Sequence, residues 1–447
     1  MMKYRLLLLL ILGVLCLMPA AAQPEIEATI PDAMPLVVMP AGQDISIFLL
    51  FGTATDNPAN PGLADTLLLV AVNRTTNSAA MLAIPRDLWA YVPGYGMKKL
   101  NSAWYLAETH TPGTGADTLK AAVRYNLGIE VDYYAHIDFN GFLSVIDTLG
   151  GIDLAVDCTI YDWKLKSREL NKLVAENYEM TLLPVGMHHL DADSALWYVR
   201  SRFTSSDLDR GRRQQDVLRA VWRKIRQSDV LGDLPTLWEQ ATRSVDTDLT
   251  LADALGFLPF ATGLDADRIT TYRFKMGDHI RNAWSPSPER AAILAPERAA
   301  VQTLIQTFVT PPTPNQVTRA ALTVQIVNAS GVERLEYVAA DRLAQEGFVP
   351  IIVDEVANFR NYNAIYDYTG STKGGALPSL QRVLRVTDEG VTLQPDPNRT
   401  ADYKIYIGHQ YLYWSCTRDV IQPRLKLDET GKLVVDDVVD DAAAGSN

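Results

Sequence analysis

Residues 45–51 (ISIFLLF), 67–72 (LLLVAV) and 79–84 (AAMLAI) are three short segments made up almost entirely of apolar side chains. Segments of this length, rich in branched and aromatic residues, are typical of buried β-strands. The polar residues 73–78 between the last two segments predict a hairpin. The sequence therefore predicts a β-sheet that contains these three strands.

Helical and strand patterns alternate after this hairpin. Helical spacing of apolar residues is found in residues 117–127, 139–149 and 209–226, and strand patterns in residues 131–138 and 152–156. Gly128 stands where the first of these helices should end, and Asp191 is placed to cap another helix that contains Tyr198 and Val199. Strands interleaved with helices predict an α/β layer fold for residues 43–308.

A second, smaller module follows a Pro-rich break at residues 309–320. The pattern predicts strands at residues 322–327, 349–353 and 403–407, and a helix at residues 335–346. Residues 321–412 are therefore expected to form a small α/β domain. Residues 413–447, rich in aspartate near their end, are expected to be an acidic tail.

The first 22 residues have the pattern of an export signal. Lys3 and Arg5 precede an apolar run at residues 6–18, and three alanines at residues 20–22 resemble a cleavage site. The run is shorter than the roughly 20 residues that a spanning helix needs. A cleaved signal and a retained membrane anchor both stay open. Residues 23–42 are expected to be a linker, and the protein is expected at the outer face of the membrane or in the cell wall.

The overall composition excludes several classes of protein. Of 447 residues, 41 are basic and 53 acidic, which gives a net charge of −12, and 47% are apolar. These values are ordinary for a folded globular chain and exclude a mainly disordered or collagen-like protein. The negative charge also argues against a protein that binds nucleic acid over its whole surface.

Only two cysteines remain once the N-terminal segment is set aside. Cys158 and Cys416 are too few for a zinc site, and no cluster of histidines accompanies them. A disulfide between them is one interpretation, and two unrelated buried thiols are the other. We expect the unrelated thiols.

One segment of the chain has the opposite charge to the rest. Residues 200–226, here named the basic island, hold nine basic and three acidic side chains, so the island carries +6 and the remainder −18. Its basic residues are Arg200, Arg202, Arg210, Arg212, Arg213, Arg219, Arg223, Lys224 and Arg226.

The island contains the start of the predicted helix at about residue 209, and Arg200 and Arg202 precede it in a segment expected to be extended, with both side chains on the same side. Arg210, Arg213 and Gln214 share one stripe of the predicted helix, and this stripe becomes apolar at Val217 and Val221. A helix N-terminus attracts anions, and guanidinium groups match phosphate oxygens. This arrangement favours a ligand with a phosphate head and an apolar tail. The alternative is a solvated basic face with intrahelical ion pairs such as Asp209 with Arg213.

Two carboxylates are expected near one end of the predicted hairpin. Asp65 precedes the second strand, and Asp87 follows Arg86 directly after the third. Carboxylates of this kind bind magnesium together with substrate phosphates. From spacing alone, however, the simpler interpretation is that Asp65 lies in a turn and Asp87 caps a bend. Lys99 is likewise more typical of plain surface.

Taken in series, several motifs resemble those of the LytR–CpsA–Psr family. The matching segments are residues 65–70 (DTLLLV), 84–87 (IPRD), 99–103 (KLNSA), 133–142 (YYAHIDFNGF), 149–153 (LGGID), 190–196 (LDADSAL), 198–202 (YVRSR) and 207–215 (DLDRGRRQQ). They occur in the family's order over about 160 residues. Residues 324–328, Gly331 and residues 343–348 resemble the LytR C-terminal domain.

The resemblance implies a fold and an activity. The fold would be a central mixed β-sheet flanked by helices, with an apolar lipid cavity between them. The activity would be a magnesium-dependent glycopolymer phosphotransferase that moves a glycan from a polyprenyl-pyrophosphate carrier to peptidoglycan or a similar envelope acceptor. A pyrophosphatase side activity would accompany it.

The resemblance also implies roles for individual residues. Residues expected to bind the substrate are Lys99, Arg200, Arg202, Arg210, Arg213 and Gln214. Arg86, Asp87 and Asp207 are expected in catalysis, with Asp87 or Asp207 as the general base, and Asp65 with Asp87 as magnesium ligands. The chain departs from the family at Asp209, where a glycine is common. A carboxylate there should pair with Arg210 or Arg213.

Two other functions stay open. A non-catalytic envelope protein would bind polyprenyl phosphate without turnover, although the intact Arg86-Asp87 pair argues against this. A DNA-binding regulator would use the basic island, but the export signal and the charge of −18 elsewhere argue against it. We therefore expect no nucleic-acid partner.

Overall fold

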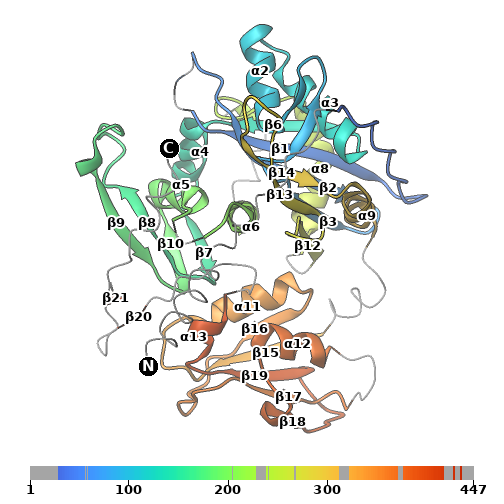
Figure 1. Ribbon diagram of the computed structural model, residues 1–447. Helices are drawn as coiled ribbons and strands as arrows, with labels where there is room; N and C mark the ends of the chain where they lie inside the picture. Colours follow the sequence, from blue (N-terminus) through green and yellow to red (C-terminus); the bar gives the residue numbers. More distant parts are fainter. Residues whose placement is uncertain are drawn as a thin grey trace, which may run out of the picture. The chain divides into compact units, whose positions relative to one another are not determined.

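The computed structural model describes residues 29–416 apart from 56, 58, 204, 228–237, 240, 266–267, 312–321 and 371–375, together with 426–427 and 433–434 (Figure 1). The predicted signal or anchor, residues 1–22, lies outside the described residues. The chain divides into two units. One comprises residues 1–37, 85–130 and 274–306, and the other residues 38–84, 131–273 and 307–447.

The larger unit is built on a six-stranded mixed sheet. Its strands, in order across the sheet, are β11 (Asp246–Thr247), β6 (Tyr133–Ile137), β1 (Ile45–Thr53), β2 (Ala64–Asn73), β3 (Ser78–Ala83) and β12 (Ile269–Arg273). β2 pairs antiparallel with both β1 and β3, whereas β6 and β12 are parallel to their neighbours β1 and β3. The predicted hairpin of residues 67–84 is confirmed, with Leu68 opposite Ala83.

The described residues of this part of the larger unit form helices α4 (Phe139–Thr148), α5 (Ala192–Arg200), α6 (Asp207–Gln227) and α8 (Leu251–Gly263). Leu218 and Trp222 of α6 pack with Val70 of β2, Met81 of β3 and Phe260 of α8, so α6 covers one face of the sheet. The predicted central mixed sheet flanked by helices is confirmed. The apolar lipid cavity between sheet and helices stays a prediction.

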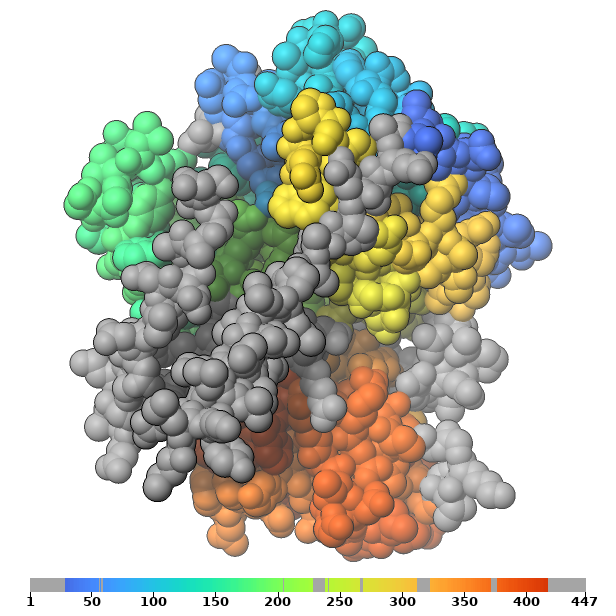
Figure 2. All heavy atoms as spheres, in the orientation of Figure 1, coloured from blue at the N-terminus to red at the C-terminus, as the bar shows by residue number. Residues whose placement is uncertain are grey.

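Two antiparallel ribbons complete this part. β7 (Ile152–Val156) pairs with β10 (Gly186–Leu190), and β8 (Ile160–Leu165) pairs with β9 (Tyr178–Leu183). The second ribbon forms a projecting green lobe in Figure 2, and Leu173 near its tip is 94% exposed. Helix α5 follows β10 directly and begins at Asp191, whose carboxylate accepts a hydrogen bond from the Ser194 amide at 2.8 Å, as the sequence predicts.

The C-terminal module has its own five-stranded sheet. In order, the strands are β16 (Val349–Ile352), β15 (Thr323–Asn328), β19 (Tyr403–Ile407), β17 (Ala364–Asp367) and β18 (Val391–Leu393). Helices α11 (Leu335–Gln345), α12 (Leu377–Leu384) and α13 (Tyr411–Trp414) accompany it. Val324, Ile326, Val338 and Leu343 are fully buried in its core. The predicted small α/β module is therefore confirmed as a fold.

Among its described residues, the smaller unit contains two hairpins, two helices and most of a third. Its elements are β4 (Trp89–Val92), β5 (Gly96–Lys99), α2 (Ser102–His110), α3 (Gly115–Leu127), β13 (Ile280–Trp284), β14 (Ala292–Pro296) and most of α9 (Arg298–Val309). Helix α3 ends at Gly128, which has the left-handed conformation (φ 67°). A Cβ atom there would lie 2.2 Å from the Pro35 carbonyl oxygen, so only glycine fits this helix end.

Cys158 and Cys416 form a disulfide across 258 residues of chain. Our expectation of two unrelated thiols is therefore wrong. The bond joins the loop after β7 to the end of the C-terminal module. The Ser415 hydroxyl also donates to the Asp157 carbonyl oxygen at 2.6 Å, so the two cysteines are held together by their neighbours as well.

We expect the variant with Cys158→Ser and Cys416→Ser to lose about 2–5 kcal/mol of unfolding free energy, because the bond restricts a very long loop in the unfolded chain. Urea unfolding of the variant and of the wild-type protein, each with and without reductant, measures this. Reductant should lower the stability of the wild-type protein to that of the variant and leave the variant unchanged. Equal stability of the two oxidised proteins would contradict the prediction.

Within the part of the chain that the structure describes, no helix combines the length and the apolar character needed to cross a membrane.

Candidate functional site

Helix α6 carries most of the basic island, and its arginines are buried. Arg210, Arg212, Arg213 and Arg219 each expose 6% of their surface or less. A buried charge must be paired or hydrogen-bonded to be tolerated. The alternative of a solvated basic face is therefore wrong for these four, although the expected pair between Asp209 and Arg213 is present (Nε to Oδ2, 3.0 Å).

The first turns of α6 are attached to the start of β2. Arg210 Nη2 donates to the carbonyl oxygen of Asp65 at 3.2 Å. One turn later, Gln214 Nε2 donates to Thr66 Oγ1 at 2.7 Å. Asp65, Arg210 and Gln214, which the sequence singles out, thus lie together at one end of the central sheet. Thr66, the neighbour of Asp65, lies there as well.

Asp207 lies between two guanidinium groups at the start of α6. Its Oδ1 is 3.4 Å from Arg202 Nη1 and 3.5 Å from Arg210 Nη1. Half of the Arg202 side chain and about a quarter of the Asp207 side chain are exposed, whereas Arg210 is buried. Two positive groups therefore converge at a place that a ligand can reach.

Arg200 is the last residue of α5, and its guanidinium carbon lies 4.3 Å from the centre of the Phe139 ring. The expectation that Arg200 lies in an extended segment is therefore wrong, because helix α5 continues through it. A guanidinium group that lies over an aromatic ring is held in place by the ring, while the N–H groups at the guanidinium edge stay available for hydrogen bonds. Phe139, at the start of α4, is thus the residue that positions Arg200.

Asp162 of β8 fixes the backbone that carries Arg202. Its Oδ2 accepts from the Ser201 hydroxyl and the Arg202 amide, both at 2.7 Å, and from the Phe203 amide at 3.1 Å. Asp162 was not among the site residues predicted from the sequence. The signal that could have found it is weak, because Asp162 lies about 40 positions away in a ribbon with no recognisable motif.

Arg213 is fully buried, and its contacts are with the chain itself. Its guanidinium donates to the carbonyl oxygens of Tyr198 and Ser201, to the Ser205 hydroxyl at 3.0 Å and to Asp209. These contacts connect α6 to the segment that carries Arg200 and Arg202. The predicted phosphate contact of Arg213 stays a prediction, and the structure shows a positioning role.

Asp209, the departure from the family pattern, pairs with Arg212 at 2.9 Å and with Arg213 at 3.0 Å. Burial opposes ionisation of this carboxyl, but the two guanidinium groups outweigh it and lower the pKa of Asp209. The expected pairing with Arg213 is confirmed. In the ion pairs that the structure shows, Asp209 pairs with neither Arg202 nor Arg210. It therefore does not neutralise the charge of these two arginines there.

The opposite side of α6 carries a buried charge cluster. Arg212 Nη1 contacts Asp157 at 2.8 Å and Asp216 at 3.0 Å. Further along the helix, Arg223 pairs with Asp341 of α11. Burial, strengthened by the charge of Asp157, raises the pKa of Asp216 to about 6. These contacts connect α6 with β7 and with the C-terminal module.

The pH dependence of stability should therefore differ between the wild-type protein and Asp216→Asn. The pKa of Asp216 is about 6 in the folded chain, and that of an unfolded aspartate is about 3.9. Between these values only the folded chain holds the proton, so this carboxyl stabilises the fold fully below about pH 4 and loses that contribution as the pH rises through 6. The Asp216→Asn variant has no carboxyl group at this position, so it cannot show this change of stability with pH.

Urea unfolding from pH 4.5 to 7.5 measures this difference. Relative to Asp216→Asn, the wild-type protein should lose roughly 2 kcal/mol over the range. The matched control is Asp191→Asn, which lies outside this cluster and keeps a capping side chain on α5. The pKa of Asp191 is lowered, so its contribution changes only in more acid solution and the curve of this variant should stay parallel to the wild type. Parallel curves for Asp216→Asn would contradict the assignment.

In the smaller unit, Asp87 lies between two basic side chains. Its Oδ1 is 2.9 Å from Lys99 Nζ, and its Oδ2 is 3.6 Å from Arg86 Nε. The backbone around it is fixed, because the Asn101 amide donates to the Arg86 carbonyl oxygen and the Leu294 amide to that of Asp87. Lys99, which spacing alone assigned to plain surface, thus lies beside the Arg86-Asp87 pair.

The predicted magnesium ligands have suitable chemistry. Magnesium is commonly bound by one or two carboxylates together with substrate phosphates. Asp87 offers a half-buried carboxylate in the smaller unit, and Asp65 offers one at the start of β2 in the larger unit. No group of three or more metal-binding side chains occurs among the described residues. The pairing of Asp65 with Asp87 stays a prediction.

Comparisons with known proteins add a family and relatives. The model of the LytR_cpsA_psr family matches residues 24–295. The polyisoprenyl-teichoic acid–peptidoglycan teichoic acid transferase TagT of Bacillus subtilis is 32% identical over 215 residues, which cover 47% of this chain and 62% of TagT. The transferase TagV of the same organism is 28% identical over 215 residues, covering 47% of this chain and 51% of TagV.

The match thus spans between half and two thirds of the length of these relatives. Among solved structures, that of B. subtilis TagV aligns with a TM-score of 0.48 at 22% identity, over 59% of this chain and 96% of TagV.

Proposed function

The chain belongs to the LytR_cpsA_psr family, and from this membership we propose that it is a cell-wall phosphotransferase. Its donor would be a glycopolymer on a polyprenyl-pyrophosphate carrier, and its acceptor peptidoglycan or a similar envelope glycan. The observation that carries the proposal is the convergence of Arg202 and Arg210 on Asp207, beside Asp65 and Thr66 of β2. The relatives TagT and TagV are named as teichoic acid transferases, which supports the reaction class.

The reaction would proceed by in-line displacement at phosphorus. A hydroxyl oxygen of the acceptor would attack the phosphorus that bears the glycan, and the bond from that phosphorus to the bridging oxygen would break. The products would be a phosphodiester between glycan and acceptor and a polyprenyl phosphate. Asp87 or Asp207 would accept the proton of the attacking hydroxyl.

The basic side chains would stabilise the negative charge on the pyrophosphate as it is transferred. Fixed charges of this kind usually make the largest contribution in phosphoryl transfer. Arg202 is exposed enough to contact the ligand directly, Arg200 lies over Phe139, and Arg210 is anchored to β2. Arg86 and Lys99 would contribute from the smaller unit. Arg213 would hold the Arg200–Arg202 segment in place.

Magnesium would be bound by Asp65 and Asp87 together with phosphate oxygens. It would supply a positive charge that neutralises the pyrophosphate. Asp87 would have to share its carboxylate between the metal and Lys99, whose Nζ lies 2.9 Å away. If water took the place of the acceptor, the same site would act as a pyrophosphatase.

The proposal extends to the organisation of the chain. Residues 1–22 would be a signal or anchor, 43–308 the catalytic domain and 321–412 a LytR C-terminal domain, with residues 23–42 and 309–320 as linkers. Because α13 and Cys416 belong to the folded C-terminal module, the tail expected at 413–447 would begin only after Cys416. The protein would act outside the cytoplasmic membrane, where the lipid carrier presents its glycan. The alternative is an envelope protein that binds polyprenyl phosphate without turnover.

The test is incubation of the purified protein with a lipid-linked pyrophosphoryl glycan, an acceptor glycan and magnesium. The proposal expects transfer of the glycan, release of polyprenyl phosphate, and loss of both when a chelator is added. Tight binding of the lipid without either product would favour the non-catalytic alternative. Transfer that continues in the presence of the chelator would contradict only the proposed role of magnesium. The proposed transfer reaction would stand.

A further inference from the structure

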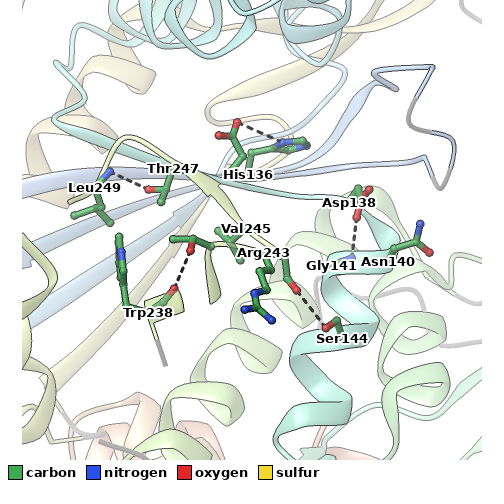
Figure 3. Close-up of a pocket in the computed structure, with 13 residues that line it drawn as sticks. His136, Asp138, Asn140, Gly141, Ser144, Trp238, Arg243, Val245, Thr247 and Leu249 are labelled. Carbon is green, nitrogen blue, oxygen red and sulfur yellow. Dashed lines mark hydrogen bonds and ion pairs between the residues drawn. The ribbon is translucent and has the colours of Figure 1, made fainter. Parts of the chain in front are cut away.

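An open pocket of about 650 Å³ lies in the larger unit (Figure 3). Its walls come from the end of β6, the first turns of α4, Trp238, residues 242–247 and Leu249. The volume lies within the range of about 300–1,000 Å³ in which proteins bind small molecules. Neither the predicted catalytic residues nor the predicted phosphate ligands line it.

Two independent features place this pocket next to the predicted phosphate site. In the sheet, Thr66 of β2 and Ile137 of β6 both lie opposite Gly52 of β1, so the two strand ends are about 10 Å apart. In addition, Phe139, between the pocket residues Asp138 and Asn140, is the ring beneath Arg200. A ligand in the pocket would therefore be close to a pyrophosphate held by the arginines.

The charges in the pocket do not suit a second phosphate. Its one arginine, Arg243, is paired with Glu239 at 2.6 Å, and two carboxylates, Asp138 and Asp246, also line it. His136 interacts with Asp246 across 4.0 Å. A dianion would meet more negative than positive charge here, so a ligand without negative charge is favoured.

The polar groups and one aromatic ring suit a sugar. Figure 3 shows Trp238 on one side of the pocket and Asp138 with Asn140 on the other, with Arg243 and Ser144 between them. An indole packs well on the apolar face of a pyranose ring. Carboxylate, amide and guanidinium groups are the planar partners that hydrogen-bond neighbouring hydroxyl or acetamido groups.

The pocket is held in shape by its own residues. The Asp138 carboxylate accepts from the Gly141 amide at 2.7 Å and so caps α4, and the Ser244 hydroxyl donates to that of Ser144 at 3.2 Å. A Cβ atom at Gly141 would lie 2.2 Å from the Ser244 carbonyl oxygen. Only glycine therefore lets the 238–249 segment approach α4 so closely.

We propose that this pocket binds an uncharged sugar residue of the glycan next to the transferred phosphate. The proposal rests on the proposed phosphotransferase function. Trp238 would pack on the sugar ring, and Asp138, Asn140 and Arg243 would bind its hydroxyl or acetamido groups. The sugar belongs either to the acceptor glycan or to the donor glycan, which have the same chemistry at this point.

The test is calorimetric titration of the full chain with two probes that contain no lipid. One is a tetramer of N-acetylglucosamine, which represents the acceptor, and the other is the glycan portion cut from the donor. The wild-type protein should bind at least one of them, and the one it binds identifies the source of the sugar. Trp238→Ala and Asn140→Ala should each weaken that binding at least tenfold.

The matched control is Trp163→Ala, which removes a half-exposed tryptophan from β8, outside the pocket, and should leave the sugar affinity unchanged. Polyprenyl pyrophosphate is titrated in parallel and should bind all four proteins equally. No sugar binding by the wild-type protein, or unchanged binding by both pocket variants, would overturn the proposal. Polyprenyl pyrophosphate binding is a separate readout, so these outcomes leave the proposed function standing.

Discussion

Arg86→Ala should lower the rate of glycopolymer transfer by about 10²–10³-fold, the usual loss when one positioned donor is removed from a reacting centre. The side chain is about one fifth exposed and lies 3.6 Å from the Asp87 carboxylate, so it can reach a ligand. The Arg86 carbonyl oxygen, which accepts from the Asn101 amide, is unaffected by the change. We therefore expect the fold to persist.

The transfer rate is measured with purified Arg86→Ala under saturating donor and acceptor, and thermal unfolding reports on the fold. Arg281→Ala is the matched control, because it removes an arginine from the same unit that is nearly half exposed and paired only with Glu297 in the ion pairs shown. It should retain wild-type activity. An Arg86→Ala protein with activity within threefold of the wild type would contradict a catalytic role.

Arg213→Ala should lose about 3–5 kcal/mol of unfolding free energy, because it removes one partner of a buried ion pair. It would leave Asp209 with Arg212 only, and the carbonyl oxygens of Tyr198 and Ser201 without their donor. Urea unfolding measures this loss. The segment that carries Arg200 and Arg202 should loosen at the same time, so activity should fall as a secondary effect.

The comparison with Arg202→Ala separates positioning from ligand binding. Arg202 is half exposed and pairs with Asp207 at 3.4 Å, so its loss should change stability by no more than about 1 kcal/mol while weakening polyprenyl pyrophosphate binding. An Arg213→Ala protein as stable as the wild type but unable to bind the lipid would show that Arg213 contacts phosphate, and our assignment of a positioning role would be wrong.

The sequence was sufficient to predict the elements that dominate the fold. Apolar strands and 3.6-residue periodicity depend on neighbours in the chain, and they correctly predicted the β2–β3 hairpin, helix α6 and the C-terminal module. The family resemblance assigned Asp65, Arg210 and Gln214 to one site, and the structure brings these residues together at the start of α6 and β2.

Long-range pairing could not be predicted in the same way. Arg212 and Arg223 have long-range partners in Asp157 and Asp341, which lie 55 and 118 residues away. The helical pattern alone could not show that these ion pairs form. The disulfide spans 258 residues, and two cysteines carry no local signal of their pairing. Asp162 acts through three hydrogen bonds to a distant loop and belongs to no recognisable motif.

The two halves of the basic island therefore have different tasks. The side of α6 that bears Arg212 and Arg223 holds the helix to β7 and α11. The N-terminal end, with Arg202 and Arg210 around Asp207, is the part proposed to hold the pyrophosphate. The island's charge of +6 thus overstates the number of arginines that could meet a ligand.

The most direct measurement of the central claim is a crystal structure of the full chain with polyprenyl pyrophosphate. We predict phosphate oxygens within about 3 Å of the guanidinium nitrogens of Arg202 and Arg210, with the polyprenyl chain in an apolar cavity. A pyrophosphate bound elsewhere, while Arg202 and Arg210 contact only Asp207, would contradict the account.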